Sequence, residues 1–207
     1  ARAPQADVRA CTADSATHAG ARAVIDAAVE AFGAIDILVT SIPGPKNLTP
    51  RPFHELDAEE LDALVAAHMM SAIYTCQAAL PHMIAREGGV IINMSSDAAK
   101  IATPGEVVIG ASKAGTLMFS RTLALEQSRH GIRVHAITPS IVAGTEAYDR
   151  LMEKEFSRKL FKKAEAKAKL GVVTPADIAP LAVFLCSPGA SKMTGQGISV
   201  NGGISAA

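Results

Sequence analysis

The sequence predicts an α/β protein in which a parallel, doubly wound sheet is covered by helices on both faces. Strand-like apolar runs alternate along the chain with helical runs that are long enough to connect parallel strands. Apolar residues make up 49% of the 207 residues and aromatic residues only 4%, so the core is mostly Ala, Val, Ile and Leu. Such a core suits strands that are buried on both faces. We expect residues 1–207 to form a single domain.

The first half of the chain alternates between short apolar runs and longer stretches with apolar residues at helical spacing. These segments are a short strand at 6–11, a helix at 15–32, a strand at 35–41 and a long helix at 56–87. Ser15 or Asp14 is the expected cap of the first helix, and Gly33 ends it. Asp57 is the expected cap of the long helix.

The second half continues the alternation. Its expected elements are strands at 88–96, 132–140 and 195–203, and helices at 106–131, 146–169 and 174–188. Pro139 interrupts the strand 132–140, Gly131 ends the helix before that strand, and Thr174-Pro175 is typical of a helix start. Sheets of this kind bind ligands at the carboxyl ends of their strands. We therefore expect a site just after the segments IDILV, IINM and AIT.

Charge, hydropathy and cysteine content argue against several classes of protein. The 20 basic and 20 acidic residues balance, so net charge gives no argument for nucleic acid or membrane binding. No uninterrupted apolar run reaches the ~18 residues of a membrane span, and the start ARAPQADVRA has no secretory pattern. Cys11, Cys76 and Cys186 have neither CxxC nor metal-ligand spacing, and we expect buried, reduced thiols. The sequence thus indicates a cytoplasmic protein without a metal site.

Six segments resemble, in order and spacing, the short-chain dehydrogenase/reductase family. They are FGAIDILV, QAALPHM, GGVIINMSS, GASKAGTLMFSRTLALE, GIRVHAITP and PADIAPLAVFLCSPGASKMTGQGISVNGG, within residues 8–203. The resemblance implies a Rossmann-like fold that uses a nicotinamide cofactor for carbonyl–alcohol chemistry. In this family a tyrosine transfers the hydroxyl proton, and a lysine one helical turn later lowers the pKa of the phenol and holds the nicotinamide ribose. A serine hydrogen-bonds the reacting oxygen, and an asparagine anchors a water of the proton relay.

Only part of that catalytic set is matched here. Ser96 stands at the serine position and Lys113 at the lysine position. Ile109 stands four residues before the lysine, where the family has its tyrosine, and His68 stands at the asparagine position. General acid–base assistance is typically worth about 10²–10⁴ in rate, so its loss without a substitute predicts a very poor redox enzyme.

The cofactor positions have also changed. Thr40 and Ser41 begin the segment that matches the family's asparagine-rich turn, Pro139 follows the sixth family strand, and Cys11 replaces an adenine-contacting aspartate, although Asp14 is nearby. The family's first two strands and its glycine-rich, pyrophosphate-binding turn have no counterpart in the sequence. We therefore expect no cofactor on this chain, or NAD or NADP if the chain is active.

Those two strands would lie between the expected first strand, 6–11, and the strand 35–41. Their absence predicts a gap of roughly 14 Å in the sheet. Either the sequence is the ordered part of a longer chain, which we favour because residues 1–14 resemble the far side of an intact sheet, or the first strand and helix are repositioned.

Each change in the active centre has a second interpretation. Tyr148 or Tyr74 could replace the lost tyrosine, and His68 could be either a substitute acid or a buried core histidine. Lys113 could simply hydrogen-bond backbone or pair with Asp97. Ser96 could cap the strand end.

Residues 149–169 carry eight Lys or Arg against four Asp or Glu. In the family this region covers the substrate, so a basic lid could favour an anionic substrate such as an acyl-CoA, and a solvated helical face is the alternative. The helix 106–126 and the last strand match the surfaces through which relatives form dimers and tetramers.

The leading hypothesis is a non-catalytic or impaired subunit that assembles with an active homologous subunit. The 2-[hydroxy(phenyl)methyl]succinyl-CoA dehydrogenase of anaerobic toluene degradation is one such hetero-oligomeric pattern in the family. The second hypothesis is an active NAD(P)-dependent oxidoreductase that uses His68 or Tyr148 as substitute proton donor. The third is a redox-free lyase or dehalogenase on the same frame, which is disfavoured because the halohydrin dehalogenases keep the tyrosine.

Overall fold

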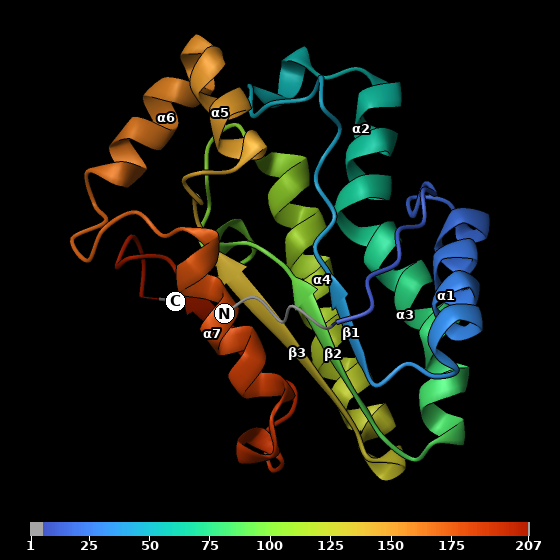
Figure 1. The fold of residues 1–207 in the computed structure, drawn as a ribbon. Coiled ribbons are helices and arrows are strands. Elements are labelled where there is room, and N and C mark those ends of the chain that lie inside the picture. Colours follow the sequence, from blue (N-terminus) through green and yellow to red (C-terminus); the bar gives the residue numbers. More distant parts are fainter. Residues whose placement is uncertain (1–5, 207) are drawn as a thin grey trace.

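A computed structural model describes residues 6–206 of the chain, which are built around a four-stranded parallel sheet (Figure 1). The strands are β1 (Ile37–Thr40), β2 (Gly89–Met94), β3 (Ile132–Pro139) and β4 (Gly197–Val200), side by side in that order. Their pairing is parallel throughout, with Ile91 of β2 opposite Leu38 and Val134. The predicted α/β fold class is confirmed.

Helices connect the strands and cover both faces of the sheet. They are α1 (His18–Phe32), α2 (Ala58–Val65), a π-helical turn (Ala66–Met70), α3 (Ser71–Ala85), α4 (Val107–Gln127), α5 (Glu146–Glu153), α6 (Glu155–Glu165) and α7 (Pro175–Cys186). Short 3₁₀ turns lie at Phe53–Glu55, Asp97–Ala99, Ser128–His130 and Pro188–Ala190. Helices α1, α3 and α4 lie on one side of the strands and α7 lies on the other (Figure 1).

The alternation of side chains along β2 builds a separate core on each face. Ile91 points into a cluster with Met83 of α3 and Leu123 of α4. Its neighbour Ile92 points the other way, into a cluster with Leu185 of α7. Ile91 and Ile92 are both fully buried, as expected for strands covered on two faces.

The long helical stretch Ala58–Ala85 begins where the sequence predicts. Asp57 accepts a hydrogen bond from the backbone N–H of Glu60, whose carboxylate accepts one from Asp57 in return, which completes a capping box. This stretch is also the one helix among residues 6–206 whose length and composition would suffice for a membrane span. Its packing against α1 and α4 explains its apolar character within the fold.

Several predicted boundaries are wrong. Residues 6–11 form no strand. Thr17, not Ser15 or Asp14, caps α1, because its hydroxyl accepts a hydrogen bond from the N–H of Gly20. The predicted helix 146–169 is two helices that break at Lys154, whose backbone is extended. Cys11 is exposed rather than buried, since it lies in this irregular segment.

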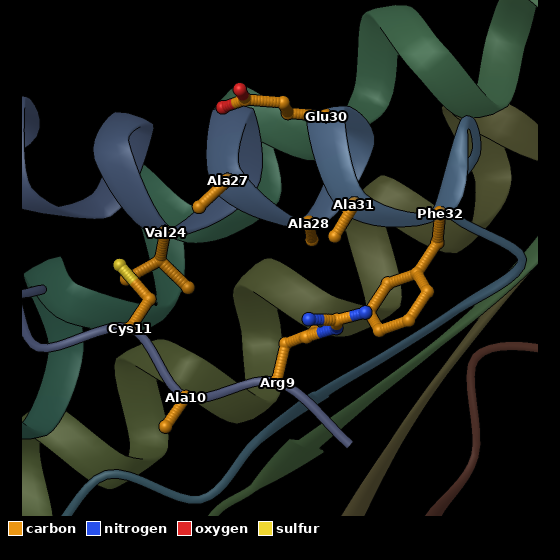
Figure 2. A pocket seen from close by; sticks show the side chains of 9 residues that line it. All are labelled: Arg9, Ala10, Cys11, Val24, Ala27, Ala28, Glu30, Ala31 and Phe32. Atoms are coloured by element: carbon orange, nitrogen blue, oxygen red, sulfur yellow. The ribbon is translucent and has the colours of Figure 1, made fainter. Parts of the chain in front are cut away.

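The expected gap in the sheet does not form, because residues 6–14 contribute no far-side strand and β1 is an edge. Residues 1–5 of the expected far side lie outside the described residues. Beside β1 the side chains of Ile37 and Val39 are about half exposed. Figure 2 shows the hollow of about 740 Å³ between residues 9–11 and α1, with Arg9 and Phe32 facing each other at one end.

The buried side chain of Asn93 joins four elements of the fold. Its Oδ1 accepts hydrogen bonds from Thr40 Oγ1 of β1 at 2.7 Å and from Cys76 Sγ of α3 at 3.6 Å. Its Nδ2 donates to Ser120 Oγ of α4 at 2.9 Å. One amide thus sets the positions of β1, α3 and α4 relative to β2.

Replacing Asn93 with leucine should lower the free energy of unfolding by about 2–4 kcal/mol, because Thr40 and Ser120 would lose a partner inside the core. Urea unfolding followed by circular dichroism measures this. The control is Met118→Ala on the exposed side of α4, which should change stability by less than about 0.5 kcal/mol. Equal effects of the two substitutions would contradict the role of the amide.

Candidate functional site

Ser96 and Lys113 meet at the carboxyl end of β2. Lys113 comes from the second turn of α4 and donates from Nζ to the carbonyl of Met94 at 2.9 Å. A second hydrogen bond joins the same two segments: Ser95 Oγ donates to the backbone carbonyl of Lys113 at 2.8 Å. Ser96 caps the 3₁₀ turn Asp97–Ala99, because its Oγ accepts from the N–H of Ala98 at 3.2 Å.

The surroundings of Lys113 change its ionisation. Burial lowers the pKa of its ammonium from 10.5 to about 8. Asp97 is not its ion-pair partner: Asp97 Oδ2 accepts from Asn201 at 3.0 Å and from Ser205 at 2.7 Å. Lys113 hydrogen-bonds backbone, which is one of the roles that the sequence left open.

Ile109 lies one helical turn before Lys113, on the half-buried first turn of α4. Residues four apart on a helix are neighbours on its surface, so a side chain at 109 reaches the same region as Lys113. An aliphatic side chain there can neither donate nor accept a proton. Helix α4 thus keeps the four-residue spacing between position 109 and Lys113, but position 109 carries no proton-transferring group.

His68 lies in the π-helical turn between α2 and α3, close to Lys113. Burial and the charge of Lys113 lower the pKa of its imidazole to about 4, so the ring is neutral at pH 7. Its Nδ1 is buried without a hydrogen-bond partner. A Cβ added at Gly44 would lie 2.6 Å from Nε2, so the loop after β1 packs directly on the ring. The backbone carbonyl of His68 accepts from Thr116 Oγ1 at 3.1 Å.

Neither tyrosine is placed beside Lys113. Tyr148 of α5 donates its hydroxyl to Glu165 of α6 at 2.5 Å, and this hydrogen bond raises the pKa of the phenol. Tyr74 of α3 stacks edge-on against His18 of α1, with ring centres 5.8 Å apart. These contacts hold the two rings at other places in the fold.

The positions expected to face a nucleotide are mostly used inside the protein. Thr40 is buried and donates to Asn93. Pro139 is the last residue of β3 and pairs with Val200, while Ser41 is exposed just after β1. In the first turn of α1, the N–H of Gly20 donates to the hydroxyl of Thr17.

A nicotinamide dinucleotide therefore finds only part of a site on residues 6–206. Lys113 keeps donor capacity at the carboxyl edge of the sheet, but no built cradle for the pyrophosphate accompanies it in this part of the chain. The same residues hold no group of three or more His, Cys, Asp or Glu that could bind a metal ion.

Glu106 is a functional candidate that the sequence analysis missed. It lies just before α4, three residues ahead of Ile109, and lines a cavity together with Ser96. Burial raises the pKa of its carboxyl group to about 7. No hydrogen bond or ion pair of that carboxyl group exists among residues 6–206. The sequence could not reveal this raised pKa, because a single glutamate before a helix is a common feature. The burial that raises the pKa comes from the tertiary packing of α6 and the segment 97–105.

Comparison with known proteins gives one consistent result. A family model described as enoyl-(acyl carrier protein) reductase matches residues 1–205. D-threitol dehydrogenase of Mycolicibacterium smegmatis is 34% identical in an alignment of 202 residues that covers 94% of this chain and 72% of that protein. 2-(R)-Hydroxypropyl-CoM dehydrogenase of Xanthobacter autotrophicus is 29% identical over 94% of this chain and 76% of its own length. A solved structure titled as a short-chain dehydrogenase/reductase, from Burkholderia xenovorans, superimposes with a TM-score of 0.84 at 26% identity, covering 94% of this chain and 74% of that one.

Substituting Lys113 with methionine should stabilise the fold in a pH-dependent way. The folded pKa of about 8 lies below the ordinary 10.5, so between these values the unfolded chain binds more protons and wild-type stability rises with pH. At pH 7 the charged, buried lysine costs on the order of 3 kcal/mol, and the cost fades toward pH 10.5.

Urea unfolding of both proteins from pH 7 to pH 10 measures this difference. Lys169→Met, on an exposed side chain, is the matched control and should show no such trend. A stability difference between wild type and Lys113→Met that stays constant with pH would contradict the lowered pKa.

Proposed function

The chain belongs to the short-chain dehydrogenase/reductase family, and on that premise we propose that it is an oxidoreductase-type subunit with impaired proton transfer. One observation carries the proposal: Ile109 occupies the position of the proton donor while Lys113 of the same helix hydrogen-bonds the carbonyl of Met94. Transfer of a hydride to a carbonyl leaves an alkoxide that needs a proton. Isoleucine supplies none, and neutral His68 has only its ring nitrogens, packed under Gly44, to offer.

In this proposal the chain assembles with a homologous subunit that is an active NAD-dependent alcohol dehydrogenase, in the cytoplasm. Apolar side chains on the outer surfaces of α4 and α7 support assembly. Met118 and Leu125 of α4 are 57% and 78% exposed, and Val183 of α7 is 69% exposed. Large apolar side chains left in contact with water on the outer surfaces of two helices are candidates for burial in a subunit interface.

The substrate of the assembly is proposed to be a hydroxyacyl-CoA. A relative from Bacillus subtilis that is 36% identical over 92% of this chain is named a probable 2,4-dienoyl-CoA reductase. The exposed basic residues of α6 and the segment after it, among them Arg158 and Lys169, would attract such an anionic substrate.

A second candidate is an active NAD(P)-dependent carbonyl reductase with a substitute proton donor. Its support is that these relatives are named dehydrogenases or reductases. His68 and Tyr148 are weak donors in this arrangement, because the imidazole is neutral and packed and the phenol is held by Glu165. Glu106 is better placed, since it lines a cavity with Ser96.

Ile109→Tyr distinguishes these functions. If the chain binds a nicotinamide cofactor, the new phenol beside Lys113 should raise ketone reduction by roughly 10²–10⁴ over wild type. Consumption of NADH and NADPH with a panel of ketones and acyl-CoA thioesters measures the rate, and fluorescence titration measures cofactor binding separately. Ile109→Phe is the control, because it adds the ring without the hydroxyl.

Wild-type turnover close to that of active relatives would contradict the impaired-subunit proposal and support the second candidate. Negligible wild-type turnover, together with co-purification of a homologous subunit that carries the tyrosine, is the outcome expected from the first.

A further inference from the structure

A cavity of about 290 Å³ lies between the segment 96–106 and α6. Among its polar side chains, which also include Thr103, Ser140 and Ser205, two groups carry the argument. Lys163 and Lys167 come from α6 and the turn that follows it, and Ser96, Asp97 and Glu106 come from the segment after β2. Cavities of this size hold small molecules, so both groups can contact the same ligand.

The two lysines are free to bind an anion. Within residues 6–206, Lys159 pairs with Glu155 at 2.6 Å and Lys162 pairs with Glu165 at 2.7 Å. Lys163 and Lys167 have no ion pair in the same part of the chain. Two cations of α6 are thus neutralised by acids of the same helix, while Lys163 and Lys167, which line the cavity, are not.

The opposite group is acidic but only partly charged. Asp97 is 5% exposed and is fixed through Oδ2 by Asn201 and Ser205, while its Oδ1 is buried without a partner. Glu106 has the raised pKa of about 7, so near neutral pH about half of its population carries an O–H donor. A ligand oxygen at this end would meet the hydroxyl of Ser96 and the neutral carboxyl of Glu106.

Apolar side chains form the wall between the two groups. Leu151 of α5 and Leu160 and Phe161 of α6 line the cavity, with Ile101 on the opposite side. A chain of methylene groups would be buried there, at about 0.8 kcal/mol for each. The cavity is therefore complementary to an amphipathic molecule rather than to a simple ion.

We propose that this cavity binds a hydroxy- or oxo-carboxylate with a short alkyl chain. Lys163 and Lys167 bind the carboxylate, the apolar wall contacts the chain, and Ser96 and Glu106 hydrogen-bond the hydroxyl or keto oxygen. This assignment rests on the proposed function, because it names the substrate class of the same site, in which Ser96 hydrogen-bonds the reacting oxygen. Binding itself needs neither the nicotinamide cofactor nor Ile109.

The arrangement makes binding depend on pH in a defined direction. The other charged groups that line the cavity are Asp97, Lys163 and Lys167. Protonated Glu106 donates to the ligand, whereas ionised Glu106 repels the ligand's oxygen and adds negative charge near its carboxylate. With a pKa of about 7, the protonated fraction falls roughly tenfold between pH 6 and pH 8, and affinity should fall in proportion.

Isothermal titration calorimetry of the purified chain with 3-hydroxyhexanoate tests the proposal. The wild type should bind about tenfold more tightly at pH 6 than at pH 8. Glu106→Gln keeps a donor of the same size and should bind about equally at both values. The double variant Lys163→Ala, Lys167→Ala should lose tenfold or more, because charge-assisted hydrogen bonds are the strongest contacts offered.

The matched controls separate this site from general basic attraction. Lys169→Ala removes a nearby charge that does not line the cavity and should leave the affinity unchanged. The methyl ester of the ligand lacks the negative charge and should bind at least tenfold more weakly. Hexanoate, which lacks the hydroxyl but keeps the carboxylate, should show a smaller pH dependence than 3-hydroxyhexanoate.

Equal binding of the acid and its methyl ester would overturn the proposal, as would full affinity in the double lysine variant. Absence of binding at millimolar ligand would also overturn it. These results would leave the impaired-subunit proposal standing, since that proposal is decided by turnover and by Ile109→Tyr.

Discussion

The buried amide of Asn93 is the contact on which the arrangement of the site depends. It bonds Thr40, Cys76 and Ser120, and so joins β1, α3 and α4 to the end of β2. Each partner is itself removed from water, so none can exchange its hydrogen bond for solvent without opening the core. The amide therefore fixes which face of α4 is turned toward the strands.

That face of α4 carries a row of polar contacts at helical spacing. Ser120 bonds Asn93, Thr116 bonds the carbonyl of His68, and Lys113 bonds the carbonyl of Met94. Residues three or four apart lie on one face of a helix, so the contact at Ser120 also fixes the rotation of α4 that turns Lys113 toward the strands. These contacts fix the position of Lys113, and the residue one turn earlier, Ile109, is aliphatic.

The same frame leaves different surroundings on its two sides. On the side of β1, Thr40 donates its hydroxyl to Asn93, and the hydroxyl of Thr17 accepts from the N–H of Gly20. The cavity under α6 is lined by Lys163, Lys167 and Glu106, and burial raises the pKa of that carboxyl group to about 7. Polar groups are therefore used in internal contacts near β1, whereas they line a cavity near α6.

The sequence by itself determined the alternation of strands and helices, the fold class, the cap at Asp57, and the match of Ser96, Lys113, Ile109 and His68 to one family's catalytic positions. Those features follow from periodicity and spacing along the chain. The strand predicted at residues 6–11 is wrong, because an apolar segment forms a strand only where a neighbouring strand pairs with it. Only the tertiary structure decided that Lys113 bonds Met94, that Tyr148 is held by Glu165, and that Glu106 and two unpaired lysines share a cavity. Burial and pairing depend on which distant segments pack together, and charge and hydrogen-bonding capacity are set by that packing rather than by residue type.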